Sequence, residues 1–285
     1  DGKLPGKETA RILSEMAKKD CFFGMDIGTK CDDLSKRLNI VLNLFSCLTE
    51  QEQNAVKKFL YFSAGIWPDV PSIKTRESCV KPLREQITAF TKGGGPFSHH
   101  LAAIGEGGID HHWNPSGADG RCEADFDKEV YDGERELFIM QLLLAKELDL
   151  PFVVHSRDGF KDTLECIKES SYNRGIIHCY SYGIEEARSF LDAGWYLAFG
   201  GAVTYTKKSK MQDMEALLRF VPSDRLLLET DAPYLSPVPL RGQMNTPLNI
   251  RLTYDFIAQK RGCSVQELCA LVDKNCKLLF RLGEA

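Results

Sequence analysis

The stretch Leu101-Ala-Ala-Ile-Gly-Glu106 is a short apolar run that ends in a potential metal ligand. Three later stretches have the same form: Pro151-Phe-Val-Val-His155, Gly175-Ile-Ile-His178 and Leu226-Leu-Leu-Glu-Thr-Asp231. Apolar runs of this length, bounded by turn residues, are typical of strands that are buried on both faces, as in a parallel sheet. Helical patterns fill the intervals, so the sequence predicts an α/β fold with alternating strands and helices.

The four potential ligands occupy the same relative position, at the ends of their predicted strands. In a parallel α/β barrel the carboxyl ends of all strands face one side of the sheet. Glu106, His155, His178 and Asp231 are therefore expected to converge. Two imidazoles and two carboxylates are suitable ligands for one or two divalent cations. The alternative is a barrel whose mouth merely contains polar residues.

Seven strands are predicted along the chain. They lie near residues 22–27, 60–66, 102–106, 151–155, 175–178, 195–200 and 226–231. The intervening helices are expected over 7–20, from a capping Asp32 or Asp33 to Phe45, and over 72–90, 128–148, 159–169, 184–193, 211–220, 247–261 and 264–282. A closed barrel of this kind needs eight strands. Because the sequence opens on a helix, the first strand is the one expected to be missing, and residues 1–285 are expected to form a single barrel domain.

Composition limits the classes of partner and compartment. The chain has 285 residues, of which 43% are hydrophobic, and this is enough to bury a large core. The net charge of -4 argues against a broadly basic surface, so a polyanion would have to be held locally by a metal and a few Lys or Arg side chains. Ten cysteines without a Cys-x-x-Cys pair indicate reduced thiols and a cytoplasmic protein. No apolar run reaches the roughly 20 residues of a membrane span, and no obligate protein partner is evident.

Four segments carry a family resemblance: Ala103-Ile-Gly-Glu-Gly-Gly-Ile-Asp110, Pro151-Phe-Val-Val-His-Ser-Arg-Asp158, His178-Cys-Tyr-Ser181 and Leu228-Glu-Thr-Asp-Ala-Pro-Tyr234. Together they resemble the TatD-like metal-dependent DNases, and the match runs from the opening helix to the C-terminus. The resemblance implies a TIM-type (β/α)8 barrel, a divalent metal site and hydrolysis of phosphodiester bonds in DNA, typically exonucleolytic. It also implies that the four potential ligands are the metal-binding residues, with Glu106 in the place of a bridging carboxylate.

The sequence departs from the family pattern at three places. Many members carry a His-x-His pair on the first strand, and this pair is absent from the sequence shown. Where the family often has Gly-Val-His-Pro-His, this chain has Gly65-Ile-Trp-Pro-Asp69, so that Trp67 replaces a His that would meet the substrate. The common Asn-Glu-Pro appears as Asn245-Thr246-Pro247. These changes leave the substrate range open.

Two carboxylates are the candidate catalytic residues, Glu106 and Asp231. A divalent cation such as Mg²⁺, Mn²⁺ or Zn²⁺, held by Glu106 and the two histidines, would lower the pKa of a bound water by several units, to about 7. Asp231 is expected to serve as both ligand and general base, because a carboxylate can orient the attacking water and accept its proton. A helix-capping Asp before Ala-Pro is the alternative for this residue.

Basic residues near the strand ends are candidates for phosphate binding. Arg157 follows His155 by two residues and could bind a phosphate through charge-assisted hydrogen bonds, with a surface ion pair as the alternative. Lys207, Lys208 and Lys210 could form a local phosphate track, although a solvated loop is the simpler interpretation.

Other residues near the strand ends could contact the substrate. An aromatic face can stack a base, which makes Trp67, Trp113 and Tyr180 candidates, with packing under loops as the alternative. Asp110 and His112 follow Glu106 closely enough to support the metal ligands or to touch the substrate.

The expected function is divalent-metal-dependent hydrolysis of DNA, on single strands or strand ends. Two alternatives remain open. The same metal site could act on an ester or amide, as a D-aminoacyl-tRNA deacylase does, and Trp67 motivates this alternative. The chain could also be a nucleic-acid or partner-binding protein whose site has decayed, and the absent His-x-His pair motivates this one.

Overall fold

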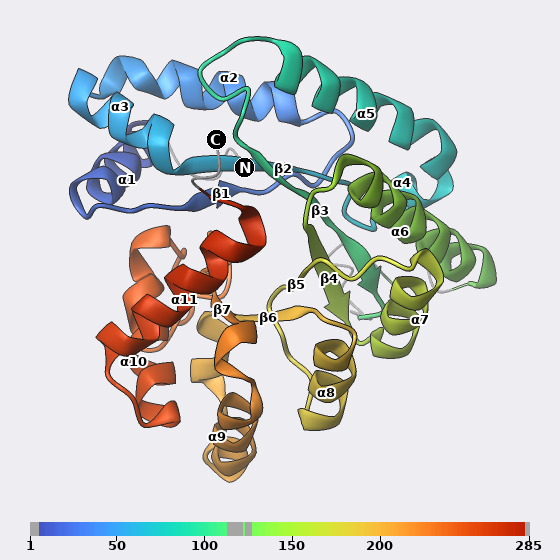
Figure 1. The fold of residues 1–285 in the computed structure, drawn as a ribbon, viewed down its shortest axis with the longest axis vertical. Coiled ribbons are helices and arrows are strands. Elements are labelled where there is room, and N and C mark those ends of the chain that lie inside the picture. The colour runs from blue at the N-terminus through green and yellow to red at the C-terminus, as the bar shows by residue number, and fades with distance from the viewer. Residues whose placement is uncertain (1–5, 113–121, 123–126, 283–285) are drawn as a thin grey trace. The chain divides into compact units, whose positions relative to one another are not determined.

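The computed structural model describes residues 6–112, 122 and 127–282. These residues contain seven strands, the predicted number, and helices fill the intervals between them (Figure 1). The chain divides into two compact units, residues 1–172 and residues 173–285. Among the described residues, no helix is both long enough and apolar enough to cross a bilayer. The expectation of one barrel domain over residues 1–285 stays a prediction.

The first unit contains four parallel strands that pair in chain order. They are β1 (Gly24–Asp26), β2 (Leu60–Ala64), β3 (Leu101–Asp110) and β4 (Phe152–Arg157). Its helices are α1 (Gly6–Lys18), α2 (Leu34–Leu44), α3 (Glu50–Phe59), α4 (Val70–Lys74), α5 (Arg76–Lys92), α6 (Lys128–Leu148) and α7 (Phe160–Ser170). Helices α5, α6 and α7 pack on β3. Phe62, Ile104 and Val154 are fully buried, as expected for strands covered on both faces.

Strand β3 does not end at Glu106, and β4 does not end at His155. Pairing between the two strands continues to Asp110 and Arg157, with a register shift at Glu106. The backbone N–H of Glu106 donates to the Gly28 carbonyl at 2.7 Å. The two strands can approach closely here because Gly108, with φ +147°, has no side chain: a Cβ at this position would lie 2.0 Å from the carbonyl oxygen of His155. The predicted strand ends were therefore wrong for both residues.

The second unit contains three parallel strands, β5 (Gly175–Ile177), β6 (Tyr196–Phe199) and β7 (Leu226–Leu228). Its helices are α8 (Ile184–Asp192), α9 (Met211–Phe220), α10 (Ile250–Arg261) and α11 (Val265–Phe280), and two of its short 3-10 helices are η3 (Gly201–Tyr205) and η4 (Lys208–Lys210). The predicted strand end at Asp231 was wrong, since β7 ends at Leu228. Asp231 has a left-handed backbone with φ +53°, which a strand cannot accommodate.

Two expectations about helices also need correction. The side chain of Asp33 does not cap α2; its Oδ2 accepts from the N–H groups of Thr29 and Lys30 at 3.0 and 3.1 Å and so closes the loop before the helix. The helix expected over 72–90 is divided into α4 and α5 at Thr75, whose φ of -110° departs from helical geometry.

Candidate metal centre

In the first unit, a histidine lies between two carboxylates. The Nδ1 of His155 lies 2.8 Å from Oε1 of Glu106, and its Nε2 lies 3.0 Å from Oδ2 of Asp110. Glu106 and Asp110 come from β3 and His155 from β4, so the pairing of these two strands sets the geometry. We call these three residues the His155 cluster.

The charges within the His155 cluster depend on one another. Burial acts to lower the pKa of His155, but the hydrogen bonds to Asp110 and Glu106 outweigh burial, and the pKa is raised above its usual value. Burial acts to raise the pKa of Asp110, but the contact with His155 outweighs it and lowers that pKa. The two carboxylates thus favour a positive charge between them. A divalent cation between Glu106 and His155 fits this arrangement, because metal-bound histidines usually donate their second ring N–H to a carboxylate.

A fully buried glutamate supports the His155 cluster from α6. Oε1 of Glu134 accepts from the backbone N–H of Asp110 at 2.8 Å, and its Oε2 lies 3.1 Å from Nε2 of His111. The side chain of Glu134 has no solvent exposure. The other oxygen of Asp110, Oδ1, accepts from the N–H of His112 at 2.9 Å. Both carboxylate oxygens of Asp110 are therefore bound, which fixes the oxygen that faces His155.

The remaining predicted residues of the first unit lie at different distances from this cluster. The indole ring of Trp67 meets the imidazole of His155 edge-on, with 5.7 Å between the ring centres. Arg157 is half-buried and pairs in register with Asp110, whose pKa its charge helps to lower. The ring of His112 bonds to Asp158 at 2.8 Å. Trp113 lies outside the described residues.

In the second unit, three potential ligands gather beyond β5 and β7. One donor atom each from His178, Cys179 and Asp231 lie within 4.8 Å of one another. We call these three residues the His178 cluster. Cys179 and Asp231 both have left-handed backbones, with φ of +45° and +53°. Such conformations are uncommon for residues other than glycine and gather at functional sites, where they aim side chains that regular structure would turn away.

Glu229 supports the His178 cluster. Its Oε1 accepts from the backbone N–H of Cys179 and lies 3.7 Å from Nδ1 of His178. Burial, together with the charge of Glu229, raises the pKa of the Cys179 thiol well above its usual value. The raised pKa disfavours the thiolate, which is the form that binds metal, so His178 and Asp231 are the stronger donors.

Tyr180 does not fit the substrate-contacting role that the sequence suggested. The residue is 4% exposed, its hydroxyl donates to the Gly183 carbonyl at 2.6 Å, and its ring packs against Phe190 and Phe199. The left-handed turn at Cys179 returns the chain to β6, where the N–H of Tyr180 donates to the Ala198 carbonyl. Tyr180 therefore belongs to the core of the second unit.

Sequence reasoning missed one member of the His178 cluster, Cys179, and the two glutamates that support the clusters, Glu229 and Glu134. Cys179 and Glu229 directly adjoin predicted features, in His178-Cys179 and in Leu228-Glu-Thr-Asp231, and that adjacency was the available signal. Glu134 gave no signal, because it lies between other charged residues of α6 and looks like part of a solvated helix face.

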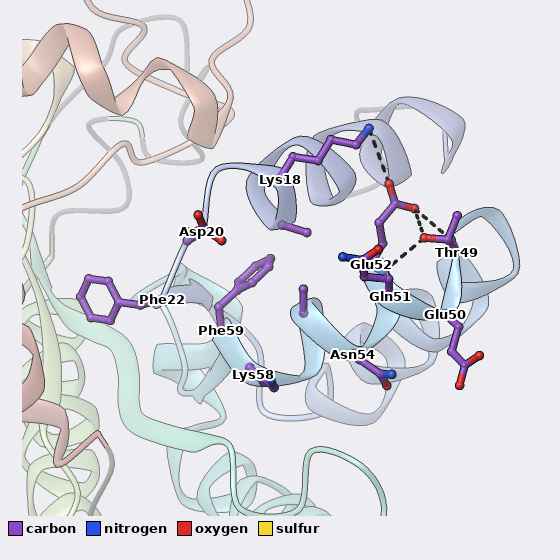
Figure 2. A pocket seen from close by; sticks show the side chains of 13 residues that line it. Lys18, Asp20, Phe22, Thr49, Glu50, Gln51, Glu52, Asn54, Lys58 and Phe59 are labelled. Atoms are coloured by element: carbon purple, nitrogen blue, oxygen red, sulfur yellow. Dashed lines mark hydrogen bonds and ion pairs between the residues drawn. The ribbon is translucent and has the colours of Figure 1, made fainter.

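The first unit also has a cavity of about 940 Å³ beside α1 and α3 (Figure 2). Lys18, Phe22, Glu52 and Phe59 are among its lining residues, and none of the predicted metal ligands lines it. The carboxylate of Glu52 accepts a hydrogen bond from Ser14, and it also bonds to Thr49 in the capping box of α3. This cavity is therefore distinct from the His155 cluster.

Comparisons with known proteins identify the family of this chain. The family model "TatD related DNase" matches residues 10–281. The chain is 33% identical to the uncharacterized metal-dependent hydrolase YabD of Bacillus subtilis over 227 residues, which are 79% of each protein. It is 29% identical to the putative deoxyribonuclease TATDN3 of Mus musculus over 207 residues, which are 73% of this chain and 64% of that protein.

The crystal structure of YJJV, a TatD homologue from Escherichia coli, has the same fold. Its TM-score is 0.72 at 23% identity, and the match covers 99% of this chain and 94% of that chain. This likeness confirms the predicted barrel-type α/β fold class. With the family match over nearly the whole chain, it follows that this protein belongs to the TatD-related DNase family of metal-dependent hydrolases.

Proposed function

We propose that this chain hydrolyses phosphodiester bonds in DNA, on single strands or at strand ends. The names of its family and of the mouse relative support this substrate. The observation that carries the proposal is His155, held between the carboxylates of Glu106 and Asp110 at 2.8 and 3.0 Å. This is the environment of a histidine that is oriented for a metal on one side and fixed by a carboxylate on the other.

The ligands in this proposal come from both units. Glu106 and His155 of the His155 cluster, with His178 and Asp231 of the His178 cluster, would hold one or two divalent cations. Family membership supports this assignment, since the carboxyl ends of all strands face one side of a (β/α)8 barrel. When bound, a divalent cation supplies Lewis-acid polarisation of a phosphoryl oxygen and acidifies a water molecule. Imidazole donors favour Zn²⁺ over Mg²⁺.

The protein's own groups have separate roles in this mechanism. Asp231, in its left-handed turn, accepts the proton of the attacking water. Asp110 acts on the reaction only through His155, whose ring it keeps in one orientation, and so it is a positioning residue. Arg157, two residues beyond His155, binds a non-bridging phosphate oxygen by charge-assisted hydrogen bonds. In this proposal Asp231 supplies the base and Arg157 supplies a positive charge for the phosphate.

One observation favours a second substrate class, an ester or amide such as the aminoacyl ester of a mischarged tRNA. The indole of Trp67 stands edge-on to His155, 5.7 Å between ring centres, and makes an apolar wall beside the cluster. An apolar wall suits the side chain of an aminoacyl group as well as it suits a base.

A cleavage assay with an end-labelled single-stranded oligonucleotide distinguishes the two proposed substrate classes. The chain is incubated with Mn²⁺ or Mg²⁺, with and without chelator, beside the variants Asp231→Asn and Asp213→Asn. Asp213 is an exposed residue of α9, so its variant makes the same chemical change away from the clusters. A ladder of shortened products that is lost with chelator and with Asp231→Asn, but not with Asp213→Asn, is expected. Release of an amino acid from an aminoacyl ester without any DNA cleavage would overturn the proposal in favour of the second substrate.

A further inference from the structure

One short segment of the second unit holds an unusual share of the exposed apolar side chains. Eight large hydrophobic residues are exposed among the described parts of the chain, and four of them lie between residues 234 and 244. They are Tyr234, Leu235, Val238 and Met244, at 52%, 37%, 48% and 48% exposure. Concentrated apolar exposure on a folded surface marks a binding site more often than chance packing does.

This segment is held in one shape by its own hydrogen bonds. Asn245 is fully buried, and its side-chain amide donates to the carbonyls of Thr230 and Tyr234 at 2.8 and 2.7 Å. The hydroxyl of Ser236, itself 2% exposed, donates to the Gln243 carbonyl at 2.8 Å. The loop therefore presents its apolar side chains on a fixed backbone, so that binding of a ligand does not have to order this backbone.

A second segment lies directly against this loop. The N–H of Val238 donates to Oγ1 of Thr204 at 2.9 Å, and the hydroxyl of Tyr205 donates to the Ser236 carbonyl. A Cβ on Gly201 would lie only 2.2 Å from the carbonyl oxygen of Leu235, which shows how closely the two backbones approach. We call residues 201–210 and 232–245 together the unit-2 rim.

The unit-2 rim carries charge of one sign. Its charged residues are Lys207, Lys208, Lys210 and Arg241, and it contains no Asp or Glu, although the whole chain has a net charge of -4. The three lysines are exposed, and the guanidinium of Arg241 lies over the ring of Tyr205, 4.4 Å from its centre. The rim thus combines positive charge with four exposed apolar side chains, Tyr234, Leu235, Val238 and Met244, which we call the apolar shelf.

We propose that the unit-2 rim binds the end of a single-stranded DNA, with phosphates at the lysines and Arg241 and a base against Tyr234 and Leu235. The inference rests on the proposed function and names where its substrate enters. Single strands offer exposed bases together with phosphates, whereas a duplex hides its bases. The rim also adjoins the proposed general base. Residue 232 follows Asp231 directly, and the N–H of Tyr234 donates to the Asp231 carbonyl at 2.8 Å.

A second copy of this chain fits the rim less well. A symmetric dimer would bring the same surface of two copies together. The four basic residues would then face four others of the same sign, without a carboxylate on either rim to offset them.

Binding is measured by fluorescence anisotropy of a short fluorescein-labelled oligodeoxythymidylate, in chelator so that no cleavage occurs. The triple variant Lys207→Ala, Lys208→Ala, Lys210→Ala is compared with a control triple of exposed lysines on helices α5, α7 and α11, namely Lys92→Ala, Lys168→Ala and Lys274→Ala. The rim triple should weaken binding and reduce the slope of log K against log salt by about 2. The control triple should leave this slope unchanged. Equal effects of the two triples would overturn the proposal.

The apolar shelf is tested separately with Tyr234→Ala. Loss of a stacking ring should weaken single-strand binding roughly tenfold and leave binding of the matching duplex unchanged. If the variant instead abolished a concentration-dependent dimer in sedimentation and left DNA binding intact, the shelf would be a contact between copies and the inference would be wrong. Failure of the proposed function looks different: the unmodified chain would bind the oligonucleotide through the rim but would not shorten it when metal is supplied.

Discussion

The His155 cluster and the His178 cluster contain similar residue types but are built in opposite ways. In the first, the ligands lie within two paired strands, and the imidazole contacts a carboxylate at each nitrogen, at 2.8 and 3.0 Å. In the second, they lie beyond the strands, and two of the three residues adopt left-handed backbones. The first geometry depends on strand register and charge balance, and the second depends on the backbone of two turns. Substitutions that change charge should therefore affect metal binding most in the first cluster.

The largest effect is expected from removing a proposed catalytic carboxylate. Glu106→Ala and Asp231→Asn should each lower kcat/KM for DNA cleavage by about 10³-fold or more, because each removes a ligand, and Asp231→Asn also removes the base. Circular dichroism should show an intact fold. Normal turnover in either variant would remove that residue from the mechanism, and Asp213→Asn provides the matched control.

Next in size is the loss of the carboxylate that orients His155. Asp110→Asn should weaken Mn²⁺ binding by roughly 10- to 100-fold in titration calorimetry, because the amide cannot hold the ring with the same charge. Glu229→Gln is the matching change in the His178 cluster, where the carboxylate bonds to a backbone N–H and not closely to the ring. Its effect on Mn²⁺ affinity should be several times smaller. Equal losses of Mn²⁺ affinity in the two variants would mean that the two clusters do not differ in this way.

A change in stability is expected from the glutamate buried behind the first cluster. Glu134→Ala removes the acceptor for the N–H of Asp110, and Asp110 is only 2% exposed. Leaving this N–H without a partner should lower the free energy of unfolding by about 1–3 kcal/mol. Urea denaturation measures the change, and Glu129→Ala serves as the control because Glu129 is an exposed residue of the same helix. A loss no greater than that of the control would mean that the bond contributes little.

The smallest effect is expected at Cys179. Burial raises the pKa of its thiol and so disfavours the thiolate that would bind metal; Cys179→Ser should therefore change Mn²⁺ affinity by less than about threefold. A loss comparable with that of Asp110→Asn would identify the thiol as a ligand and would make the second cluster a different kind of site.

The sequence predicted the elements of this fold better than their ends. Helices α6 and α9 match their predicted ranges, because their apolar residues recur at a regular helical spacing and this pattern starts and stops at definite residues. The ends of β3 and β4 could not be predicted, since they depend on how closely Gly108 lets two distant strands approach. Pairing of this kind is a tertiary effect that local pattern does not contain.

Some residues of the candidate site were predicted from the sequence and others were not, for a related reason. Residue type and position identified Glu106, His155, His178 and Asp231 as potential ligands, and their union in one centre stays a prediction. Glu134 escaped notice because burial of a charged helical residue depends on what packs against it. Tyr180 was proposed as a substrate contact because it follows a strand end, whereas its burial depends on the packing of Phe190 and Phe199 around its ring.

The central proposal is that Glu106 and Asp231 act in the same reaction, and a double-variant cycle tests it most directly. DNA cleavage with Mn²⁺ is measured for the unmodified chain, for Glu106→Ala, for Asp231→Asn and for the two changes combined. Groups that act as a unit are strongly non-additive, so the double variant should be no more than about threefold slower than the slower single variant. If the two losses instead multiply, the two carboxylates act independently and this proposal is wrong.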